Sequence, residues 1–445
     1  AISQQQALES IAKLAKVDPA TVKVDEPAEL TFFFKEEAGD WHLAFLFNRV
    51  PVAPANFANA AGDRRSHGHG QGPSPCDAFL QLNYLVDAHD GEVLFYYSAN
   101  PTLSRCKGID ELGVSHVFYG LKNDARFELS DPLRRIKTYD LELMNDVGSP
   151  LPTNPVSSIK ADWGETNRAA ISAHVNAQRV YDFYKSVLMR DGIDDKGMEL
   201  VSVVNCTYSA VETPPQWHNG VWWQNRMWYG QDQDGNDTLR SYARYLDIIA
   251  HELTHGVTQY TSNLVYRNQS GALNESFSDI FGVIINDWDT IGSDSEVAGW
   301  NWEIGPGLGG KGNPLRDLSH PERTGDPDHM ENYLKTTSDS GGVHTNSNIH
   351  NKAAYNVLTA VDKDGQRAFP PRDVAVLYYL CLQRLGQLAD FSKALQALVL
   401  EAKTFYVGDP EECEIKVKQI EDAYKKVGIV NKKAVLSPKE KVGNL

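Results

Sequence analysis

The stretch 251–255, with the sequence HELTH, constrains this chain more than any other feature. Residues four apart lie on one face of an α-helix, so His251 and His255 can offer two imidazole nitrogens to one metal ion. Glu252 then points to the side of that pair, where a carboxylate can handle a metal-bound water without ligating the metal. The run 245–253 is largely apolar and contains no proline or glycine, which predicts a buried helix.

A third metal ligand is expected downstream, because a catalytic zinc usually has three protein ligands and an open fourth position. The segment 274–279, with the sequence NESFSD, is expected to open a second helix. Glu275 and Asp279 are four residues apart and share a face of that helix. One of them can therefore ligate the metal while the other accepts the far N–H of a liganding histidine.

The composition limits the class of protein and its partners. The chain has 445 residues, 41% of them hydrophobic, and a formal charge of −16, which predicts a globular protein with several domains. The negative charge would repel nucleic-acid backbones and anionic membranes. No apolar run approaches the roughly 20 residues that span a bilayer, so we expect neither a nucleic acid nor a membrane as partner. The five cysteines show no C-x-x-C spacing, and a pair between Cys76 and Cys106 stays open against free thiols.

The first hundred residues have the pattern of a small α+β domain. Apolar residues at helical spacing cover 4–15, and the alternation typical of strands follows at 30–34 and 41–47. Two apolar runs around Asp90-Gly91 predict a hairpin. The stretch 99–113 is expected to be an irregular linker to the next unit.

The chain is β-rich before the motif and helical after it. Residues 114–237 are rich in aromatic and β-branched residues, with one helical segment at 167–188. A loop region rich in glycine, aspartate and serine spans 305–342, where binding residues are expected. Helical spacing recurs at 275–286, 351–361, 372–385, 391–403 and 410–427. We therefore predict an α+β fold with an amino-terminal domain and linker at 1–108, a β-rich lobe at 109–250, a helical lobe at 251–431 and a loose tail at 432–445.

Several of these segments together resemble the thermolysin family of neutral zinc metallopeptidases. The resemblance covers about residues 110–430 and is carried by HELTH, the run 263–282, WEIG at 302–305, PLRDLSHP at 314–321, GDPDH at 325–329 and GGVHTNS at 341–347. It implies a two-lobed catalytic unit, with a β-rich amino lobe and a helical carboxy lobe on either side of the zinc-binding helix. It also implies an endopeptidase that cleaves proteins or peptides.

The resemblance implies a role for each of the following residues. One catalytic Zn²⁺ is ligated by His251, His255 and Glu275, and Glu252 is the general base. Tyr266 and His344 donate hydrogen bonds to the developing oxyanion, and Asp339 orients His344. Asp279 and Asn274 are the outer partners of the two histidine ligands. Each of these residues, taken alone, could instead be a packed aromatic, a loop hydrogen-bonder or a helix-end charge.

The resemblance also implies how substrate is held. Arg316 holds a substrate carbonyl, and the strand at 219–222 pairs with the peptide through Asn219, Gly220 and Trp222. An apolar pocket selects a bulky apolar residue after the cleaved bond, because buried hydrocarbon contributes about 25 cal/mol per Å². The residues that correspond to this pocket are Leu239, Ile248, Ile304 and Leu315.

The chain departs from the family's pattern at its calcium sites. Asp247 and Glu303 remain, but Asn286, Asn301 and Pro306 stand where the family has acidic residues. Two adjacent Ca²⁺ ions need dense negative charge to offset their mutual repulsion. We therefore expect one calcium ion or none.

The first hundred residues resemble part of the family's propeptide, above all in YLVDAHDGEV at 84–93. This implies a secreted, monomeric proenzyme whose amino-terminal domain assists folding or inhibits the enzyme until it is cleaved off. Two alternatives stay open. The chain could be a non-catalytic peptide-binding module that retains the fold, or a peptidase permanently inhibited by its amino-terminal domain.

Overall fold

In the computed structural model the chain forms two compact units. Unit 1 comprises 1–109, 113–138 and 153–168, and unit 2 comprises 110–112, 139–152 and 169–445. The units interleave along the chain, so they do not test the contiguous domains expected from the sequence. The residues that the structure describes are 2–22, 24, 27–35, 40–51, 82–98, 103–123, 126–144, 146–208, 216–233, 238–288 and 297–431. The expected tail and Cys76 lie outside these residues.

Unit 1 begins with an antiparallel sheet of order β1-β2-β3-β4 packed against helix α1 (Gln4–Ala15). Ser3 and Gln6 form a capping box at the start of the helix. Residues of α1, β2 and β3 share one hydrophobic core, which confirms the expected helix, strands and hairpin. The strands are β1 (Glu29–Lys35), β2 (Asp40–Val50), β3 (Leu82–Asp87) and β4 (Val93–Ser98).

Residues 103–109 do not form the irregular linker that the sequence led us to expect. They form strand β5 (Leu103–Ile109), which pairs antiparallel with β6 (Ser115–Asn123) in a sheet of order β10-β7-β6-β5. Cys106 and Gly108 are its buried residues, so the strand lacks the alternation of large apolar side chains from which strands are predicted. The thiol of Cys106 is free, and burial raises its pKa to about 11. The other two strands of this sheet are β7 (Arg126–Glu128) and β10 (Ser157–Ser158). Strands β8 (Ser130–Asp131) and β9 (Ile136–Asp140) belong to a second sheet.

A five-stranded sheet has strand β12 at one edge. Strands follow the order β12-β13-β11-β9-β8, so β12 has one neighbour within the part of the chain that the structure describes. Helix α3 (Arg168–Val187) confirms the helix expected at 167–188. The strands are β11 (Leu200–Val204), β12 (Gly220–Trp223), β13 (Arg226–Tyr229) and a separate ribbon of β14 (Gln231–Gln233) with β15 (Leu239–Ser241).

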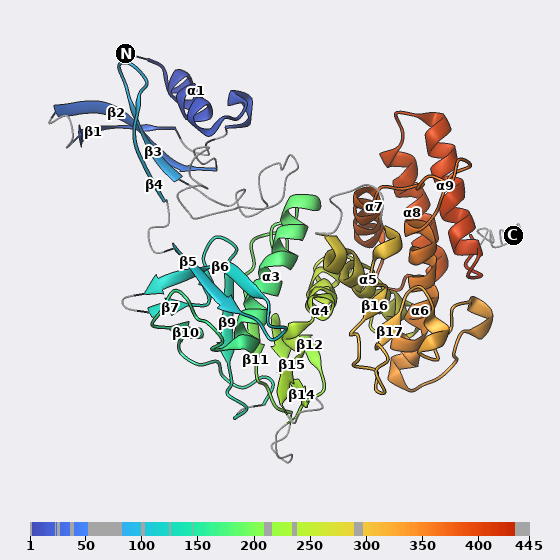
Figure 1. Cartoon of the computed structure of the whole chain (residues 1–445). Helices are drawn as coiled ribbons and strands as arrows, with labels where there is room; N and C mark the ends of the chain where they lie inside the picture. The colour runs from blue at the N-terminus through green and yellow to red at the C-terminus, as the bar shows by residue number, and fades with distance from the viewer. Residues whose placement is uncertain are drawn as a thin grey trace, which may run out of the picture. The chain divides into compact units, whose positions relative to one another are not determined.

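Helix α4 (Leu246–Gln259), which carries the HELTH motif, packs against strand β12 and against helix α5 (Asn268–Asp287). Figure 1 shows α4 with the strands β11 to β15 on one side and the helical lobe on the other. The other helices and short strands of this lobe are β16 (Glu303–Ile304), β17 (Arg316–Asp317), α6 (Asp339–Leu358), α7 (Pro371–Arg384), α8 (Phe391–Phe405) and α9 (Pro410–Lys425). None of the described helices is long and apolar enough to cross a membrane.

Helices α5 and α6 begin earlier than the expected starts at 275 and 351. Both bury polar residues where a helix usually buries apolar ones, among them Ser276, Asp279, Asn346 and His350. This hides the apolar spacing on which the sequence prediction depends. The polar interior indicates a functional or structural network at the contact between these helices.

His350 of α6 lies at the centre of a buried hydrogen-bond network. Its Nδ1 lies 2.7 Å from the hydroxyl of Ser276 in α5, and its Nε2 lies 2.8 Å from the hydroxyl of Tyr424 in α9. Its ring is stacked on Phe391. Burial lowers the pKa of His350 from 6.5 to about 3, so the folded protein keeps this imidazole neutral.

The neutral His350 makes the free energy of unfolding depend on pH. Below pH 6.5 the unfolded chain binds a proton that the folded chain refuses until about pH 3, so stability falls as pH falls, by up to roughly 1.4 kcal/mol per pH unit for one proton. We expect His350→Gln to reduce this slope when urea unfolding is measured at pH 7 and pH 5. The matched control is the exposed His320, and slopes that are equal in His350→Gln and His320→Gln would contradict the assignment.

Candidate active site

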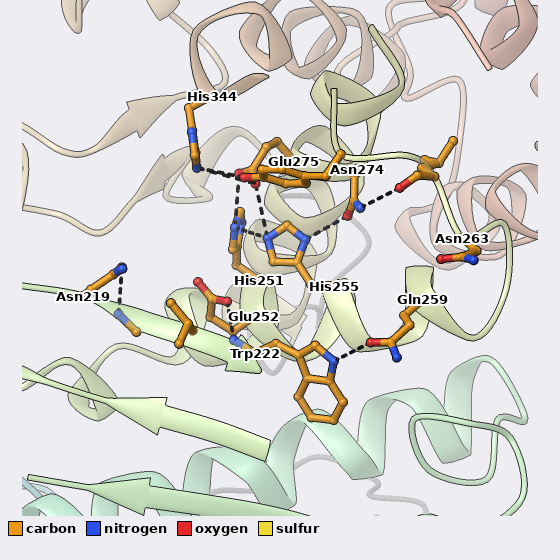
Figure 2. Close-up of a pocket in the computed structure, with 14 residues that line it drawn as sticks. Asn219, Trp222, His251, Glu252, His255, Gln259, Asn263, Asn274, Glu275 and His344 are labelled. Atoms are coloured by element: carbon orange, nitrogen blue, oxygen red, sulfur yellow. Dashed lines mark hydrogen bonds and ion pairs between the residues drawn. The ribbon is translucent and has the colours of Figure 1, made fainter. Parts of the chain in front are cut away.

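Two helices bring the proposed metal ligands together. His251 and His255 lie on the same face of α4, and Glu275 faces them from α5 (Figure 2). Their Nε2 atoms are 3.0 Å apart, and each lies 3.4 Å from an oxygen of Glu275. His251 and Glu275 are buried, and His255 is partly buried.

The outer partners fix the tautomers of the two histidines. The carboxylate of Asp279 lies 2.8 Å from Nδ1 of His251 and can only accept a hydrogen bond. The Oδ1 of Asn274 lies 2.8 Å from Nδ1 of His255, while its amide nitrogen donates to the carbonyl of Leu264. Both Nδ1 atoms therefore carry the hydrogen, and both Nε2 lone pairs point into the same space.

This donor set fits a divalent cation such as zinc. Two imidazole lone pairs and a carboxylate converge at short range, and the Oε2 of Glu275 has no hydrogen-bond partner among the described residues. Buried Lewis bases arranged in this way repel one another unless a proton or a metal lies between them. Two histidines and one carboxylate are also a ligand set found in catalytic zinc sites.

The electrostatics of the site favour positive charge at this position. Burial alone would lower the pKa of His251, but the carboxylates of Asp279 and Glu275 outweigh it and raise the pKa to about 10. Burial would likewise raise the pKa of Glu275, but the two histidines of the motif hold it well below its usual range. Asp279 keeps its charge at a pKa of about 2, because the guanidinium of Arg316 and His251 overcome its burial. The carboxylates of Glu275 and Asp279 therefore favour a positive charge beside His251.

Glu252 lies next to the histidines, within the same cluster of potential ligand atoms. The backbone N–H of Trp222 in β12 donates to its Oε2 at 3.0 Å, which holds this carboxylate on the β12 side of the site. Glu275, in contrast, is within 3.4 Å of both Nε2 atoms. The geometry therefore favours Glu275 as the third ligand and leaves Glu252 free to act on a water.

Tyr266 and His344 approach the cluster from the helical lobe. The hydroxyl of Tyr266 donates to Oε1 of Glu275 and lies 3.2 Å from Nε2 of His344. Burial of this hydroxyl beside Glu275 raises the pKa of Tyr266 well above its usual range, so it keeps its proton and can donate. Asp339 holds His344 from behind, with 2.7 Å between its Oδ1 and Nδ1 of the imidazole.

The turn before His344 depends on glycine. Asp339 and Ser340 have φ of 49° and 52°, and Gly341 has φ of 96°. A Cβ on Gly341 would lie 2.2 Å from the side-chain oxygen of Asn268, so no other residue fits there without displacing the start of α5. This turn aims His344 at the cluster.

A single pocket joins the metal ligands to the exposed edge of β12. Its lining includes the predicted residues Asn219, Gly220 and Trp222 along with the three proposed metal ligands, Glu252, Asn274, Tyr266 and His344. It also includes four residues that the sequence did not indicate, which are Val221, Gln259, Asn263 and Leu264. Gln259 could have been found from its helical spacing to Glu252, whereas Asn263 lies in a turn with no pattern to indicate it.

The four residues expected to form an apolar pocket lie outside this lining as the described residues form it. Ile248 and Ile304 are buried, Leu315 is 37% exposed, and Leu239 is partly buried. Arg316 is also outside the lining and makes a two-pronged ion pair with Asp279, with both distances 2.7 Å. Their roles toward substrate stay predictions.

Comparisons with known proteins agree with this geometry. Residues 106–259 match the model of the thermolysin metallopeptidase catalytic domain, and residues 262–429 match that of the thermolysin metallopeptidase alpha-helical domain. The chain is 38% identical to bacillolysin of Bacillus subtilis subsp. amylosacchariticus over 396 residues, which cover 82% of this chain and 69% of the relative. It is 40% identical to neutral protease NprE of Bacillus pumilus over 63% of this chain and 85% of the relative.

Other relatives are longer than the chain. It matches extracellular elastase of Staphylococcus epidermidis at 38% identity over 60% of its own length and 47% of the relative's. The chain thus spans about half the length of such relatives. Among solved structures, the precursor of protealysin, a metalloproteinase from Serratia proteamaculans, is similar with a TM-score of 0.54 and 26% identity, over 66% of this chain and 87% of that one.

The hydrogen bond between His251 and Asp279 allows a test of the proposed ligand set. We expect Asp279→Asn to lower zinc affinity by about 10- to 100-fold, because the amide cannot match the charge that holds and polarises His251. Competition with a fluorescent zinc chelator at pH 7 measures the affinity. Asp339→Asn is the matched control, because Asp339 bonds to His344, which is outside the proposed ligand set. Equal zinc affinities for the two variants and the wild-type chain would refute the role of Asp279.

Proposed function

Because the chain belongs to the thermolysin family of metallopeptidases, we propose that it is a zinc-dependent endopeptidase that acts on proteins or peptides. The observation that carries this proposal is the convergence of two Nε2 lone pairs and the Glu275 carboxylate next to Glu252. His251, His255 and Glu275 would hold the metal. A zinc ion held there supplies a Lewis acid that lowers the pKa of a bound water from about 15.7 toward 7.

We assign the general base to Glu252. Its carboxylate accepts the N–H of Trp222 through Oε2, so one of its oxygens is fixed while the other is available to the water. It takes a proton from the water as the scissile carbonyl is attacked, and it later delivers that proton to the departing amine. Its side chain lines the same pocket as the edge of β12, where an extended peptide can pair.

Tyr266 and His344 are suited to stabilise the tetrahedral oxyanion. Both line the pocket, and both can donate a hydrogen from atoms 3.2 Å apart. A comparable oxyanion donor contributes roughly 2.7–4 kcal/mol to the lowering of the barrier. Asp339 accepts the hydrogen bond from Nδ1 of His344, so His344 donates from Nε2 in the form of the imidazole that carries both protons.

For the substrate we propose a bulky apolar side chain after the cleaved bond, bound by Leu239, Ile248, Ile304 and Leu315. The support is their apolar chemistry and, for Ile248, its position behind β12, where a Cβ on Gly220 would lie 3.7 Å from its Cγ2. Arg316 would hold a substrate carbonyl with the donors that Asp279 leaves free. Asn219, Gly220 and Trp222 would pair with the peptide along the edge of β12.

We propose further that residues 1–108 serve as a propeptide and that the chain is a secreted, monomeric proenzyme. The similarity to a protealysin precursor supports the propeptide, and relatives described as extracellular elastase support secretion. A non-catalytic peptide-binding module is the main competing function. It would not need Glu252, Tyr266 and His344 together around one ligand set.

The proposal predicts the effect of changing Glu252. We expect Glu252→Gln to retain zinc and to lose at least about a hundredfold in kcat on an internally quenched peptide, because the amide cannot accept a proton. Glu331→Gln is the matched control, since Glu331 is exposed and outside the pocket. New amino termini are followed by mass spectrometry in the same incubation. A zinc-loaded, folded wild-type chain that cleaves no peptide before or after processing would favour the binding module.

Calcium does not fit the residues that the resemblance implied for it. Glu303 and Asp317 face each other across β16 and β17, and Nη1 of Arg323 lies 3.2 Å from Oε1 of Glu303 and 2.5 Å from Oδ2 of Asp317. Asp247 uses its Oδ2 to accept the N–H of Gly305 at 2.6 Å. Neither Asp247 nor Glu303 belongs to the group of His251, Glu252 and His255, whose ligand atoms lie close enough together to hold a metal. We propose that the guanidinium of Arg323 supplies here the positive charge that calcium supplies in the family.

This assignment predicts how calcium affects stability. We expect Arg323→Gln to unfold at a lower temperature than the wild-type chain, because Glu303 and Asp317 lie directly opposite and repel each other. Added CaCl2 should restore part of this loss in Arg323→Gln. In the wild-type chain, CaCl2 should raise the unfolding temperature no more than NaCl of equal ionic strength does. The exposed Arg372 provides the control, Arg372→Gln. A calcium-specific rise of Tm in the wild-type chain that Glu303→Gln abolishes would overturn the proposal.

A further inference from the structure

We propose that Gln259 is a positioning residue of this site, which holds the ring of Trp222 so that the backbone of Trp222 can fix Glu252. The inference rests on the proposed function, because Glu252 is its general base. Three contacts of Trp222, all with helix α4, carry it.

The contacts come from one stripe of α4. Glu252, Gly256 and Gln259 follow one another at spacings of four and three, so they lie on one face of the helix. Oε2 of Glu252 accepts the backbone N–H of Trp222 at 3.0 Å, and Oε1 of Gln259 accepts its indole N–H at 3.1 Å. Figure 2 shows both bonds, one at each end of the same residue.

Between these two bonds, Gly256 lets the indole ring lie directly on the helix. A Cβ at Gly256 would be 2.9 Å from Cε2 and 3.0 Å from Cζ2 of Trp222, which is closer than side-chain carbons approach one another. The ring therefore packs on bare helix backbone. Trp222 is held at its backbone, at its ring face and at its indole nitrogen by the helix that carries His251 and His255.

The hairpin of β12 and β13 needs this support. β12 has four residues and, in the described part of the chain, one neighbouring strand, and it is followed by a turn at Gln224 and Asn225 with φ of 52° and 58°. A short edge strand is easily displaced. The residue that follows α4, Tyr260, adds a contact at the tip of the hairpin, where its hydroxyl donates to Oδ1 of Asn225 at 3.2 Å.

Gln259 itself is exposed at the end of α4, and it lines the pocket at its rim. It does not touch the metal ligands. Its effect on the reaction must therefore pass through Trp222 to Glu252, and misplacement of a reacting group by about 1 Å can cost roughly a hundredfold in rate. A looser hairpin should lower the rate by less than this, because β12 still pairs with β13.

The test compares three variants of the full, zinc-loaded chain. Gln259→Leu removes the acceptor, Gln259→Glu keeps an oxygen that can accept the indole N–H, and Trp222→Phe removes the donor but keeps a ring. We expect Gln259→Leu to lower kcat about tenfold with a smaller change in KM. Gln259→Glu should stay within about threefold of wild type, even though it adds a charge at the pocket.

The double variant isolates the bond. Trp222→Phe should lose about as much kcat as Gln259→Leu, and the two together should lose no more than either alone, because they remove one shared interaction. Losses that multiply, or a Gln259→Leu chain with the kcat of wild type, would overturn the inference. So would a Gln259→Glu chain as slow as Gln259→Leu, since pocket lining alone would then explain both.

A second measurement keeps the inference independent of turnover. Hydrogen exchange followed by mass spectrometry should show faster exchange of the Trp222 backbone N–H in Gln259→Leu, and wild-type exchange in Gln259→Glu. If the wild-type chain proves to have no activity that depends on Glu252, the proposed function fails while this exchange pattern still tests the positioning. Unchanged exchange in Gln259→Leu would refute it on its own.

Discussion

The structure of this site depends on three electron-pair donors, two imidazoles and a carboxylate, that face one another across a short distance. Two imidazole nitrogens 3.0 Å apart face one carboxylate at 3.4 Å, and their hydrogens are committed on the far side to Asp279 and Asn274. Without a cation, each of the three groups would repel the next. The helices that hold them must therefore be fixed by contacts that do not depend on the metal alone.

Those contacts are polar and buried. Asp279 accepts hydrogen bonds from His251, from Arg316 and from Asn351 of α6, so one carboxylate joins three segments of the helical lobe. One turn of α5 away, Ser276 reaches His350 and through it Tyr424 of α9. Buried hydrogen bonds of this kind rigidify the contact between helices, and losing one of them is costly because its partner stays buried. This explains why α5 and α6 bury polar faces that a core helix would normally fill with hydrocarbon.

The buried polar faces of α5 and α6 also explain how far the sequence could predict the structure. The spacing of His251 and His255 within one helix could be recognised from the sequence as a metal-ligand pair, whereas Glu275, which lies on another helix, was singled out from Asp279 only by the family resemblance. The α+β architecture followed from periodicity. The starts of α5 and α6 and strand β5 could not be predicted, because polar burial and a Cys-Gly strand leave no apolar pattern. The pairing of Arg323 with Glu303 and Asp317, and that of Gln259 with Trp222, could not be predicted either. These contacts join side chains from separate elements, and no helical or strand periodicity encodes them.

Helix α4 shows how one element serves two purposes at once. Positions 251 and 255 present two of the proposed metal ligands, while positions 252, 256 and 259 form a neighbouring stripe that contacts the edge strand. Successive residues on a helix are about 100° apart, so adjacent positions such as 251 and 252 fall on different stripes of the same cylinder. One helix therefore sets the distance between the two histidines and the edge strand β12. The glycine at 256, which weakens a helix when considered alone, is the position at which that helix comes closest to Trp222.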